Sequence, residues 1–446
     1  MKNLYYILLL ASATLTMACG DDIDDDFDYG SYAESPIKSV DCAPLFVPLP
    51  VSDGSVVTIT QNGSEYSFVK ILQDGTTQST QFDFEWSMSN SVSPMMPGGP
   101  DSPDDMTEGG SLQNSDVPNI FNQEVDIELD NCTFRKNSSD EFYWDFYSSD
   151  NFGRHFFAVV KFDKDCNIVF KLDSAANLMG GGPMMDDKTG GVSKQPVKGT
   201  PLNNGGYAMI LQASSMGMAV NTDYNLILRI IDAQGKYVKD CQLDFSETVE
   251  IAVVTNVNNN IAIYYKLSDD SYYYNVYSQD GALVGAYPIE STDVIFSSLT
   301  YGNYAYLSYA NTETLELSLR QLDENGEVVQ TIPLNAIVML NNATEVDGKF
   351  CFSGTAVSDV SLLLDNSSVD ATDYQGIIAL ASNGVMEEPI IADYNNGVIV
   401  FATFKNDDGS YIVYLTQLTP LSWASSRYGD KIYIYRTDDL KKLEVN

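Results

Sequence analysis

The chain of 446 residues contains a single histidine, His155. One imidazole cannot build the paired or triple histidine sites that hold zinc, copper or iron. A Ser-His-Asp triad would have to use His155, and no Gly-x-Ser-x-Gly turn supplies a matching serine. The histidine lies in the aromatic run Phe152–Phe157, where packing within a strand is the simpler role. The sequence therefore predicts no catalytic residues and no histidine-based metal centre.

Basic residues are also scarce: 24 Lys and Arg stand against 62 Asp and Glu, a formal net charge of −38. Such a charge repels phosphate backbones, so we expect no nucleic-acid partner. Clustered carboxylates leave Ca²⁺ open as a cofactor. The best candidate loop, Asp163–Asn167, has the first spacings of a calcium loop but lacks its glycine and its distal glutamate. No other cofactor is expected.

The chain is rich in a repeated hairpin pattern. In Leu228–Asp244, two apolar runs flank a turn that contains Gly235, which can adopt the positive φ of a tight hairpin loop. From Gly235 to Gly281 is 46 residues and from Gly281 to Gly326 is 45, the length of one four-stranded propeller blade. Six similar units occur at Val69–Thr77, Ala158–Phe170, Asn275–Tyr287, Leu319–Ile332, Ile377–Ile390 and Ile432–Val445. The pattern predicts an all-β fold, a β-propeller of seven four-stranded blades.

Propellers usually close their ring by joining the two ends of the chain in one blade. The stretch Ser39–Val51 contains an apolar segment, Ala43–Pro48, that could complete the last blade beside the hairpin Ile432–Val445. We therefore expect closure by an N-terminal strand.

Two segments interrupt the repeat, at about residues 88–119 and 179–201. Both combine glycine, proline, aspartate and paired methionines, a composition that does not form regular strands. We expect two long, flexible insertions in the early blades. Their pairs Met95, Met96 and Met184, Met185 could hold Cu(I) through thioethers, although an adaptable apolar contact surface is the simpler role.

The N-terminus has the features of an export signal over residues 1–18: Lys2, an apolar core and then small residues. The run Leu15–Cys19 resembles a bacterial lipobox, in which the cysteine is lipidated. An acidic group follows immediately, and it resembles the surface-export signal of Bacteroidetes lipoproteins: Asp21, Asp22, Asp24, Asp25 and Asp26. The resemblance implies an outer-membrane protein, lipid-anchored at Cys19 and exposed at the cell surface.

These features divide the chain into a signal peptide (1–18), a lipidated acidic tether (19–38) and a propeller-like domain (39–446). The five cysteines beyond Cys19 contain no Cys-x-x-Cys spacing, which excludes a zinc ribbon and leaves disulfides open. Asp173-Ser174-Ala175 resembles the O-glycosylation sequence of Bacteroidetes exported proteins, with Ser174 as acceptor.

Two functions remain. Without a nucleophile or metal constellation, we expect a non-catalytic binding or scaffold protein that presents the propeller to an extracellular glycan or protein. The alternative is a carbohydrate-active enzyme with two carboxylates near the propeller centre, as glycosidases require. The candidate carboxylates are Asp83, Glu85, Asp145, Asp150, Glu250, Asp269, Asp270 and Asp407.

Overall fold

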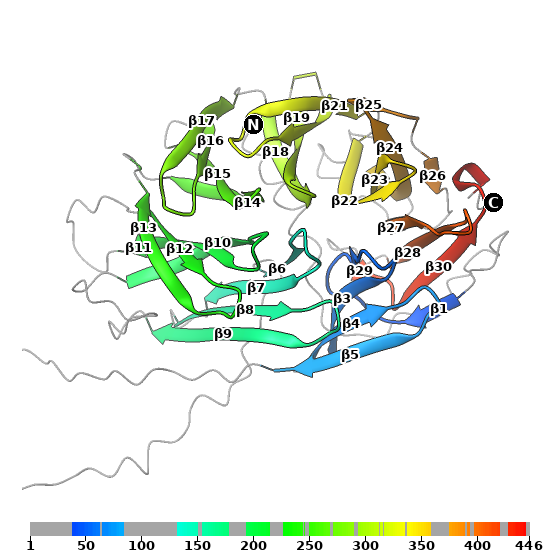
Figure 1. Ribbon diagram of the computed structural model, residues 1–446, viewed down its shortest axis with the longest axis horizontal. Coiled ribbons are helices and arrows are strands. Elements are labelled where there is room, and N and C mark those ends of the chain that lie inside the picture. Colours follow the sequence, from blue (N-terminus) through cyan, green and yellow to red (C-terminus); the bar gives the residue numbers. More distant parts are fainter. Residues whose placement is uncertain are drawn as a thin grey trace, which may run out of the picture.

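Seven antiparallel β-sheets are arranged as a ring in the computed structural model (Figure 1). Each sheet fills four strand positions, and successive strands pair with one another, so the sheets are the blades of a seven-bladed β-propeller. The structure describes residues 38–62, 65–83, 132–149, 154–177, 193–214, 226–243, 245, 249–267, 271–289, 293–311, 313–314, 316–334, 337–357, 374–388, 390–392, 397–419 and 427–442.

The blades follow one another along the chain. Blade 1 comprises β2 (Leu49–Pro50), β3 (Val56–Asn62), β4 (Glu65–Ile71) and β5 (Thr77–Phe82). Blade 2 comprises β6 (Cys132–Lys136), β7 (Phe142–Ser149), β8 (Arg154–Phe162) and β9 (Ile168–Asn177). Blade 3 comprises β10 (Ser193–Pro201), β11 (Tyr207–Ser214), β12 (Leu226–Ile231) and β13 (Tyr237–Leu243). Blade 4 comprises β14 (Glu250–Val257), β15 (Asn260–Lys266), β16 (Tyr272–Tyr277) and β17 (Leu283–Ile289).

The remaining three blades complete the ring. Blade 5 comprises β18 (Asp293–Tyr301), β19 (Tyr304–Asn311), β20 (Leu317–Leu322) and β21 (Val328–Leu334). Blade 6 comprises β22 (Ile337–Val346), β23 (Lys349–Val357), β24 (Tyr374–Ser382) and two short outer strands, β25 (Val385–Met386) and β26 (Ile390–Ala392). Blade 7 comprises β27 (Val398–Lys405), β28 (Tyr411–Thr419), β30 (Lys431–Thr437) and β1 (Lys38–Asp41), with β29 (Arg427–Tyr428) beside β28.

An N-terminal strand closes the ring, as predicted, but it is not the segment that we expected. β1 pairs with β30, and Val40 lies opposite Ile432. The predicted segment, Ala43–Pro48, forms no strand. Two of its six residues are prolines, which cannot donate to a sheet ladder. This segment instead runs beside blade 1, where Leu45 donates its backbone N–H to the carbonyl of Ile59.

Six of the seven predicted hairpins are confirmed, each joining the third strand of a blade to its outer strand. The seventh, Ile432–Val445, is wrong. β30 ends at Thr437 and is followed by a short 3-10 helix, Leu440–Lys442. The physical reason is that β1 already occupies the outer edge of blade 7, so no further strand can pair there.

The second predicted insertion overlaps a strand. We assigned residues 179–201 to it, whereas β10 occupies Ser193–Pro201 as the first strand of blade 3. Pro196 is accommodated because β10 lies at the edge of its sheet and its register with β11 shifts between Pro196 and Lys198. Residues 88–119 and 179–192 lie outside the described part of the chain.

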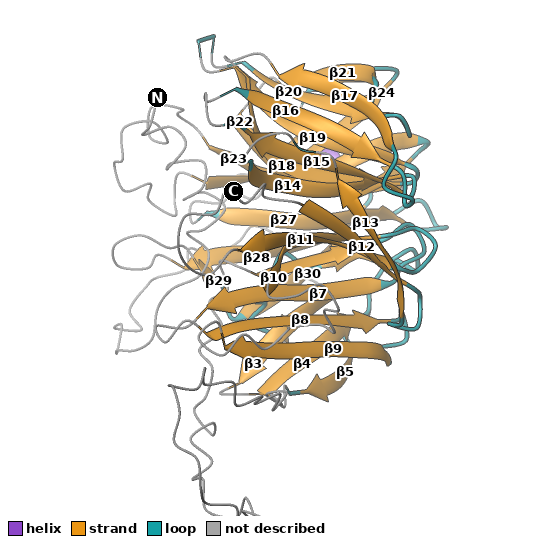
Figure 2. Cartoon of the chain, turned by 90° about the vertical axis from the view of Figure 1, so that its left-hand side faces the viewer, coloured by secondary structure: helices purple, strands orange, loops and turns teal. Residues whose placement is uncertain are grey.

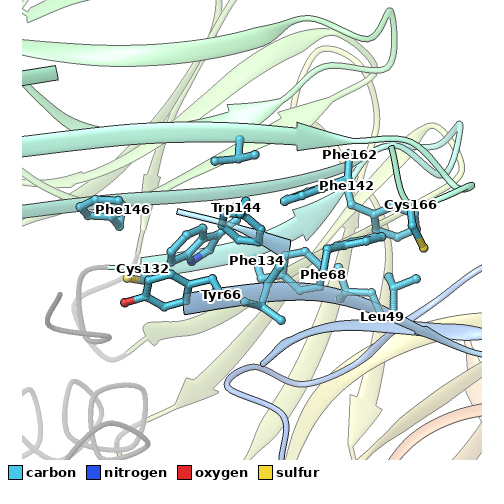
Figure 3. Close-up of a cluster of buried hydrophobic side chains, with 14 of the residues drawn as sticks. Leu49, Tyr66, Phe68, Cys132, Phe134, Phe142, Trp144, Phe146, Phe162 and Cys166 are labelled. Atoms are coloured by element: carbon cyan, nitrogen blue, oxygen red, sulfur yellow. The ribbon is translucent and has the colours of Figure 1, made fainter. Parts of the chain in front are cut away.

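The hydrophobic core is divided among the interfaces between blades. Seven clusters of buried side chains are present, and each draws its members from two neighbouring blades. Between blades 1 and 2, for example, the rings of Phe68 and Phe162 stack with centroids 4.4 Å apart, and Trp144 packs beside Tyr66 (Figure 3). Blades therefore stabilise one another mainly by burying apolar surface face to face.

The hairpin turns also connect neighbouring blades. In blade 3, the carboxylate of Asp232 accepts hydrogen bonds from the backbone N–H groups of Gln234 and Lys236, and Gly235 has a φ of +80°. A Cβ on Gly235 would lie 2.7 Å from Cγ of Phe170 on the outer strand of blade 2. The equivalent glycines also face the preceding blade: Gly75 against Lys38, Gly281 against Cys241, Gly326 against Tyr287 and Gly384 against Gln330. Most of the described turns lie on one face of the ring (Figure 2).

Two further features concern disulfide bonds and membrane-spanning helices. Cys42, Cys132, Cys166, Cys241 and Cys351 are free thiols, so none of these five is in a disulfide. Among the residues that the structure describes, no helix has the length and apolarity needed to cross a membrane.

Candidate functional site

A polar cluster lies on the inner strands of blades 2 and 3, near the axis of the ring. It consists of Thr133 and Arg135 on β6, Asp145 on β7, Lys198 on β10 and Tyr207 on β11. β6 and β10 are the first strands of their blades, and these first strands lie toward the middle of the ring (Figure 1). We refer to these five residues as the axial cluster.

The alternation of β7 explains why a carboxylate is placed there. Phe142, Trp144 and Phe146 point into the core between blades 1 and 2. Tyr143 and Asp145 therefore point to the opposite side, toward blade 3, because successive side chains of a strand alternate between its faces. Tyr143 belongs to the core between blades 2 and 3, which confirms this direction.

Both oxygens of the Asp145 carboxylate accept hydrogen bonds from hydroxyl groups. Thr133, directly opposite on β6, donates to one oxygen, and Tyr207 of blade 3 donates to the other. Burial raises the pKa of Asp145; Arg135, the bond from Tyr207 and Lys198 act in the opposite direction without cancelling it. Burial, followed by the charge of Asp145, raises the pKa of Tyr207 far above its ordinary value. Tyr207 is thus a hydrogen-bond donor and not a base.

Arg135 extends from blade 2 to blade 4. Its Nε donates to the hydroxyl of Thr133 at 3.2 Å, and its Nη1 donates to the carbonyl of Val254 on β14 at 2.8 Å. No described residue accepts a hydrogen bond from its Nη2. The guanidinium is therefore fixed in place with part of its donor capacity unused.

Lys198 is close enough for its charge to interact with those of Arg135 and Asp145. Water reaches its side chain, yet protein atoms surround it closely enough for burial to lower its pKa, and the charge of Arg135 acts in the same direction. Its Nζ has no hydrogen-bond or ion-pair partner among the described residues. After the register shift between Pro196 and Lys198, Lys198 lies opposite Ile210, a residue of the core between blades 3 and 4.

Gly199 provides the space that Tyr207 needs. A Cβ at Gly199 would lie 2.3 Å from the Tyr207 hydroxyl oxygen. The Tyr207 ring also stacks on Tyr143, with centroids 5.8 Å apart, and Tyr143 donates to the carbonyl of Gly205 at 2.7 Å. Gly199 and the ring of Tyr143 therefore both pack against Tyr207, whose hydroxyl bonds to Asp145.

Of the four nominated carboxylates that the structure describes, only Asp145 lies in this cluster. Glu250 begins β14, Asp407 lies in the turn after β27, and Asp83 follows β5. The charged groups that act on Asp145 are Arg135 and Lys198, both cations. Within the described residues, the carboxylate pair that the glycosidase alternative requires is not found here. Four candidates lie outside the described residues: Glu85, Asp150, Asp269 and Asp270.

The other nominated residues have these positions. Ser174 lies on β9, the outer strand of blade 2, opposite Phe157, and His155 lies on β8 opposite Ala176. The remaining residues lie outside the described part of the chain: Cys19, Asp21, Asp22, Asp24, Asp25, Asp26, Met95, Met96, Met184 and Met185.

The proposed calcium loop is a hairpin turn. The carboxylate of Asp163 accepts hydrogen bonds from the backbone N–H groups of Asp165 and Asn167, as the carboxylate of Asp232 does in blade 3. These bonds close the turn between β8 and β9. In the part of the chain that the structure describes, no group of three or more His, Cys, Asp or Glu side chains could hold a metal ion.

Sequence reasoning missed the other four members of the axial cluster: Thr133, Arg135, Lys198 and Tyr207. One signal was available: Asp145 interrupts the aromatic run Phe142–Tyr147, and a carboxylate inside such a strand requires a polar partner. Gly199 was a second signal, because a glycine within a strand often marks a close approach. Our assignment of residues 179–201 to an insertion concealed it.

Comparisons with known proteins add only distant similarities. No protein-family model matches the chain, and no curated protein matches it. Among solved structures, it is similar to the polysaccharide lyase Uly1 (8% identity, TM-score 0.40, covering 94% of this chain and 94% of that chain). It is also similar to the β-propeller domain of the Trilobed protease from Pyrococcus furiosus (9%, 0.36, 71% and 83%). A prolyl endopeptidase matches at 11% identity and a TM-score of 0.38, and the alignment covers 83% of this chain but only 46% of that chain.

Proposed function

We propose that the chain is a lipid-anchored, surface-exposed propeller that binds an extracellular glycan without cleaving it. The observation that carries this proposal is the axial cluster, a set of charged and hydroxyl groups near the middle of the ring of which all but Tyr207 are exposed or half-buried. Fixed polar groups of this kind suit a hydroxyl-rich ligand.

Binding is favoured over catalysis by the state of Asp145. Both of its oxygens already accept hydrogen bonds from Thr133 and Tyr207, so it is not poised as a free base. The charged groups that act on it, Arg135 and Lys198, are cations. They could hold a ligand, but a glycosidase would require a second carboxylate at this place.

A carbohydrate-active enzyme is the second candidate. One observation favours it: the pKa of Asp145 is raised and that of Lys198 is lowered within the same cluster, a combination typical of acid–base sites. Such perturbed values also arise in structural polar networks, and the occupied oxygens of Asp145 favour that interpretation.

The anchoring part of the proposal depends on the N-terminal sequence. Its supports are the export signal, the lipobox ending at Cys19 and the acidic group that follows it. Labelling with a radioactive fatty acid should mark the wild type and not Cys19→Ser. Protease treatment of intact cells should degrade the wild type, while a variant with Asp21, Asp22, Asp24, Asp25 and Asp26 changed to Asn should be protected. Equal labelling or equal protection would contradict the anchor or the surface exposure, respectively.

The binding part is tested with the full chain in a non-ionic detergent on a glycan array, followed by mass analysis of every bound saccharide. We expect binding to at least one glycan with its mass unchanged. A product of lower mass would establish the enzyme instead. An array without any bound glycan would refute a glycan ligand and would direct attention to a protein partner.

A further inference from the structure

We propose that the inner turns of blades 5 and 6 together form a binding site for a small alkylammonium group, such as a quaternary ammonium. The side chains that would hold it flank these turns: Tyr301, Tyr304, Glu345 and Phe350. We refer to these four residues as the aromatic corner. The inference does not depend on the proposed glycan binding, because it concerns a different part of the ring and a different class of ligand.

The strand register brings the four side chains to one boundary between blades. Tyr301 and Tyr304 lie opposite each other on β18 and β19, so both point to the same side of blade 5. Glu345 and Phe350 lie opposite each other on β22 and β23 in the same way. Tyr301 and Phe350 both pack against the hydrophobic core between blades 5 and 6. Each pair therefore faces the other blade, and β18 and β22 are neighbours in the ring (Figure 1).

The rings of the aromatic corner meet at a right angle and remain accessible. The centroids of Tyr301 and Phe350 are 5.5 Å apart, and their planes are at 89° to each other. Both of these residues are half-buried, whereas Tyr304 is 39% exposed and Glu345 is exposed. Burial, followed by the charge of Glu345, raises the pKa of Tyr301, as expected when a carboxylate lies beside the phenol. A ligand at this place would meet aromatic rings and a carboxylate together.

The described part of the chain supplies no cation to the carboxylate of this corner. Lys349 precedes Phe350, but strand alternation directs it to the opposite side, and its ammonium pairs with Glu387. The two turns are open as well: a Cβ on Gly302 or on Gly348 would have no atom within 4 Å. A cation from solution would therefore find a carboxylate that is not already paired.

Partly exposed tyrosines elsewhere in the ring are covered by cations of the chain itself. Three such pairs have the cation 5.2–5.7 Å from the ring centroid: Arg229 over Tyr237, Lys405 over Tyr411 and Lys266 over Tyr272. A cation at this distance is attracted by the electrons of the ring. No Lys or Arg of the described residues lies over a ring of the aromatic corner. A ligand cation would take the position that a lysine or arginine takes at the other three places.

The net charge of −38 favours a cation over a neutral sugar as the ligand. The field of an acidic chain raises the concentration of cations at its surface and has no such effect on a neutral molecule. A quaternary ammonium also needs no hydrogen-bond acceptor, and its methyl groups suit contact with aromatic rings. We therefore expect the aromatic corner to recognise an alkylated ammonium group.

The experiment compares choline with its neutral analogue dimethylbutanol, in which a carbon atom replaces the nitrogen, by calorimetry on the full chain in a non-ionic detergent. The two molecules have the same shape and differ in charge. The wild type should bind choline at least about tenfold more tightly than the analogue. Glu345→Gln and Tyr304→Leu, both at exposed positions, should each lower the affinity for choline at least about threefold.

Two matched controls remove the same groups at other exposed positions. Glu327→Gln changes a carboxylate on the outer hairpin of blade 5, and Tyr237→Leu changes a tyrosine on the outer strand of blade 3. Both variants should bind choline as the wild type does. A peptide that carries trimethyl-lysine is the second probe. Tighter binding of the peptide than of choline would indicate a protein partner, and tighter binding of choline a small molecule; either result supports the site if Glu345→Gln weakens it.

Four outcomes would overturn the inference. Equal binding of choline and dimethylbutanol would mean that the charge is not recognised. A preference for choline that survives both Glu345→Gln and Tyr304→Leu would place the cation elsewhere on the acidic surface. Binding of methyl glucoside in place of choline, weakened by Tyr304→Leu, would make the corner a sugar platform. If neither choline nor the peptide binds, the site is refuted, whatever the glycan array shows.

Discussion

Tyr207 and Asp145 belong to different sheets, and the hydroxyl of the first donates to the carboxylate of the second. No described strand of blade 2 pairs with a strand of blade 3, so this bond is one of several side-chain hydrogen bonds that cross the apolar core between these blades. It orients the residue on which the axial cluster is built.

Removing this hydroxyl should lower stability. Tyr207→Phe leaves the Asp145 carboxylate with one donor fewer, and we expect the free energy of unfolding to fall by about 1.5–3 kcal/mol, as for other hydrogen bonds to charged groups. Chemical denaturation measures the change. Tyr306→Phe is the control: Tyr306 is also buried, but its hydroxyl has no hydrogen-bond partner among the described residues, so a change within about 0.5 kcal/mol is expected. Similar losses in both variants would contradict the role of the bond.

Asp145 should stabilise the folded chain less as pH rises. Most paired carboxylates have the opposite effect, because their pKa is lowered on folding. Because burial raises its pKa in the folded state, the folded chain holds the proton to a higher pH than the unfolded chain does. The free energy of unfolding of the wild type should therefore decrease, relative to Asp145→Asn, as pH rises from the ordinary carboxyl value of 3.8 through the raised value, and then level off.

Denaturation of both proteins over a pH series tests this prediction, and the difference between them removes the contribution of the other acidic groups. Asp140 provides a control with the opposite sign. The charge of Lys136 and hydrogen bonds from Ser52 and Lys136 outweigh the effect of burial and lower its pKa. Its stabilising contribution, relative to Asp140→Asn, should accordingly be lost as pH falls. A wild-type advantage over Asp145→Asn that grows with rising pH would show that the raised pKa is wrong.

The turn glycine of blade 3 should be intolerant of a methyl group for two reasons. Gly235→Ala combines a φ of +80° with a Cβ only 2.7 Å from Phe170. Gly302→Ala has a similar φ of +58° but no atom within 4 Å of its Cβ, so it isolates the conformational cost. We expect Gly235→Ala to destabilise the fold by about 1–3 kcal/mol more than Gly302→Ala does, the usual range for overpacking. Equal losses of unfolding free energy would mean that the turn does not press on blade 2.

Closure by β1 should depend on one buried residue. Val40 packs between blades 7 and 1, whereas its neighbour Ser39 is exposed. Val40→Asp should lower the free energy of unfolding by at least about 2 kcal/mol, because it buries a carboxylate without a partner. Ser39→Asp adds the same charge on the exposed side and should change it by less than about 0.5 kcal/mol. Thermal melting that does not distinguish the two variants would argue against closure through this strand.

The sequence was informative wherever structure is local. Gly235, Gly281 and Gly326 mark hairpins whose two strands are adjacent in the chain, so turn chemistry and spacing were sufficient to predict the blades. β1 could not be recognised in this way. Its four residues contain one buried side chain, Val40, and its partner strand lies at the other end of the described chain.

The axial cluster was beyond sequence reasoning for a similar reason. Arg135, Asp145 and Lys198 come from three strands in two blades, and their proximity depends on how the blades pack. Asp145 was identified as a candidate, but only as one of eight carboxylates. The partners that distinguish it are cations and a tyrosine, and no spacing rule relates these residue types along a chain.

The turns that rest on the preceding blade give the ring a direction. Gly235 of blade 3 covers Phe170 of blade 2, and Gly281 of blade 4 covers Cys241 of blade 3, whereas no outer-hairpin glycine in the described part of the chain lies against the following blade. If the outer strand of one blade opens, the hairpin turn of the following blade loses the surface on which it rests. The hairpin turn of the preceding blade keeps its contact. Amide protection against hydrogen exchange should accordingly be lost progressively around the ring, away from a damaged blade and in the order of the chain.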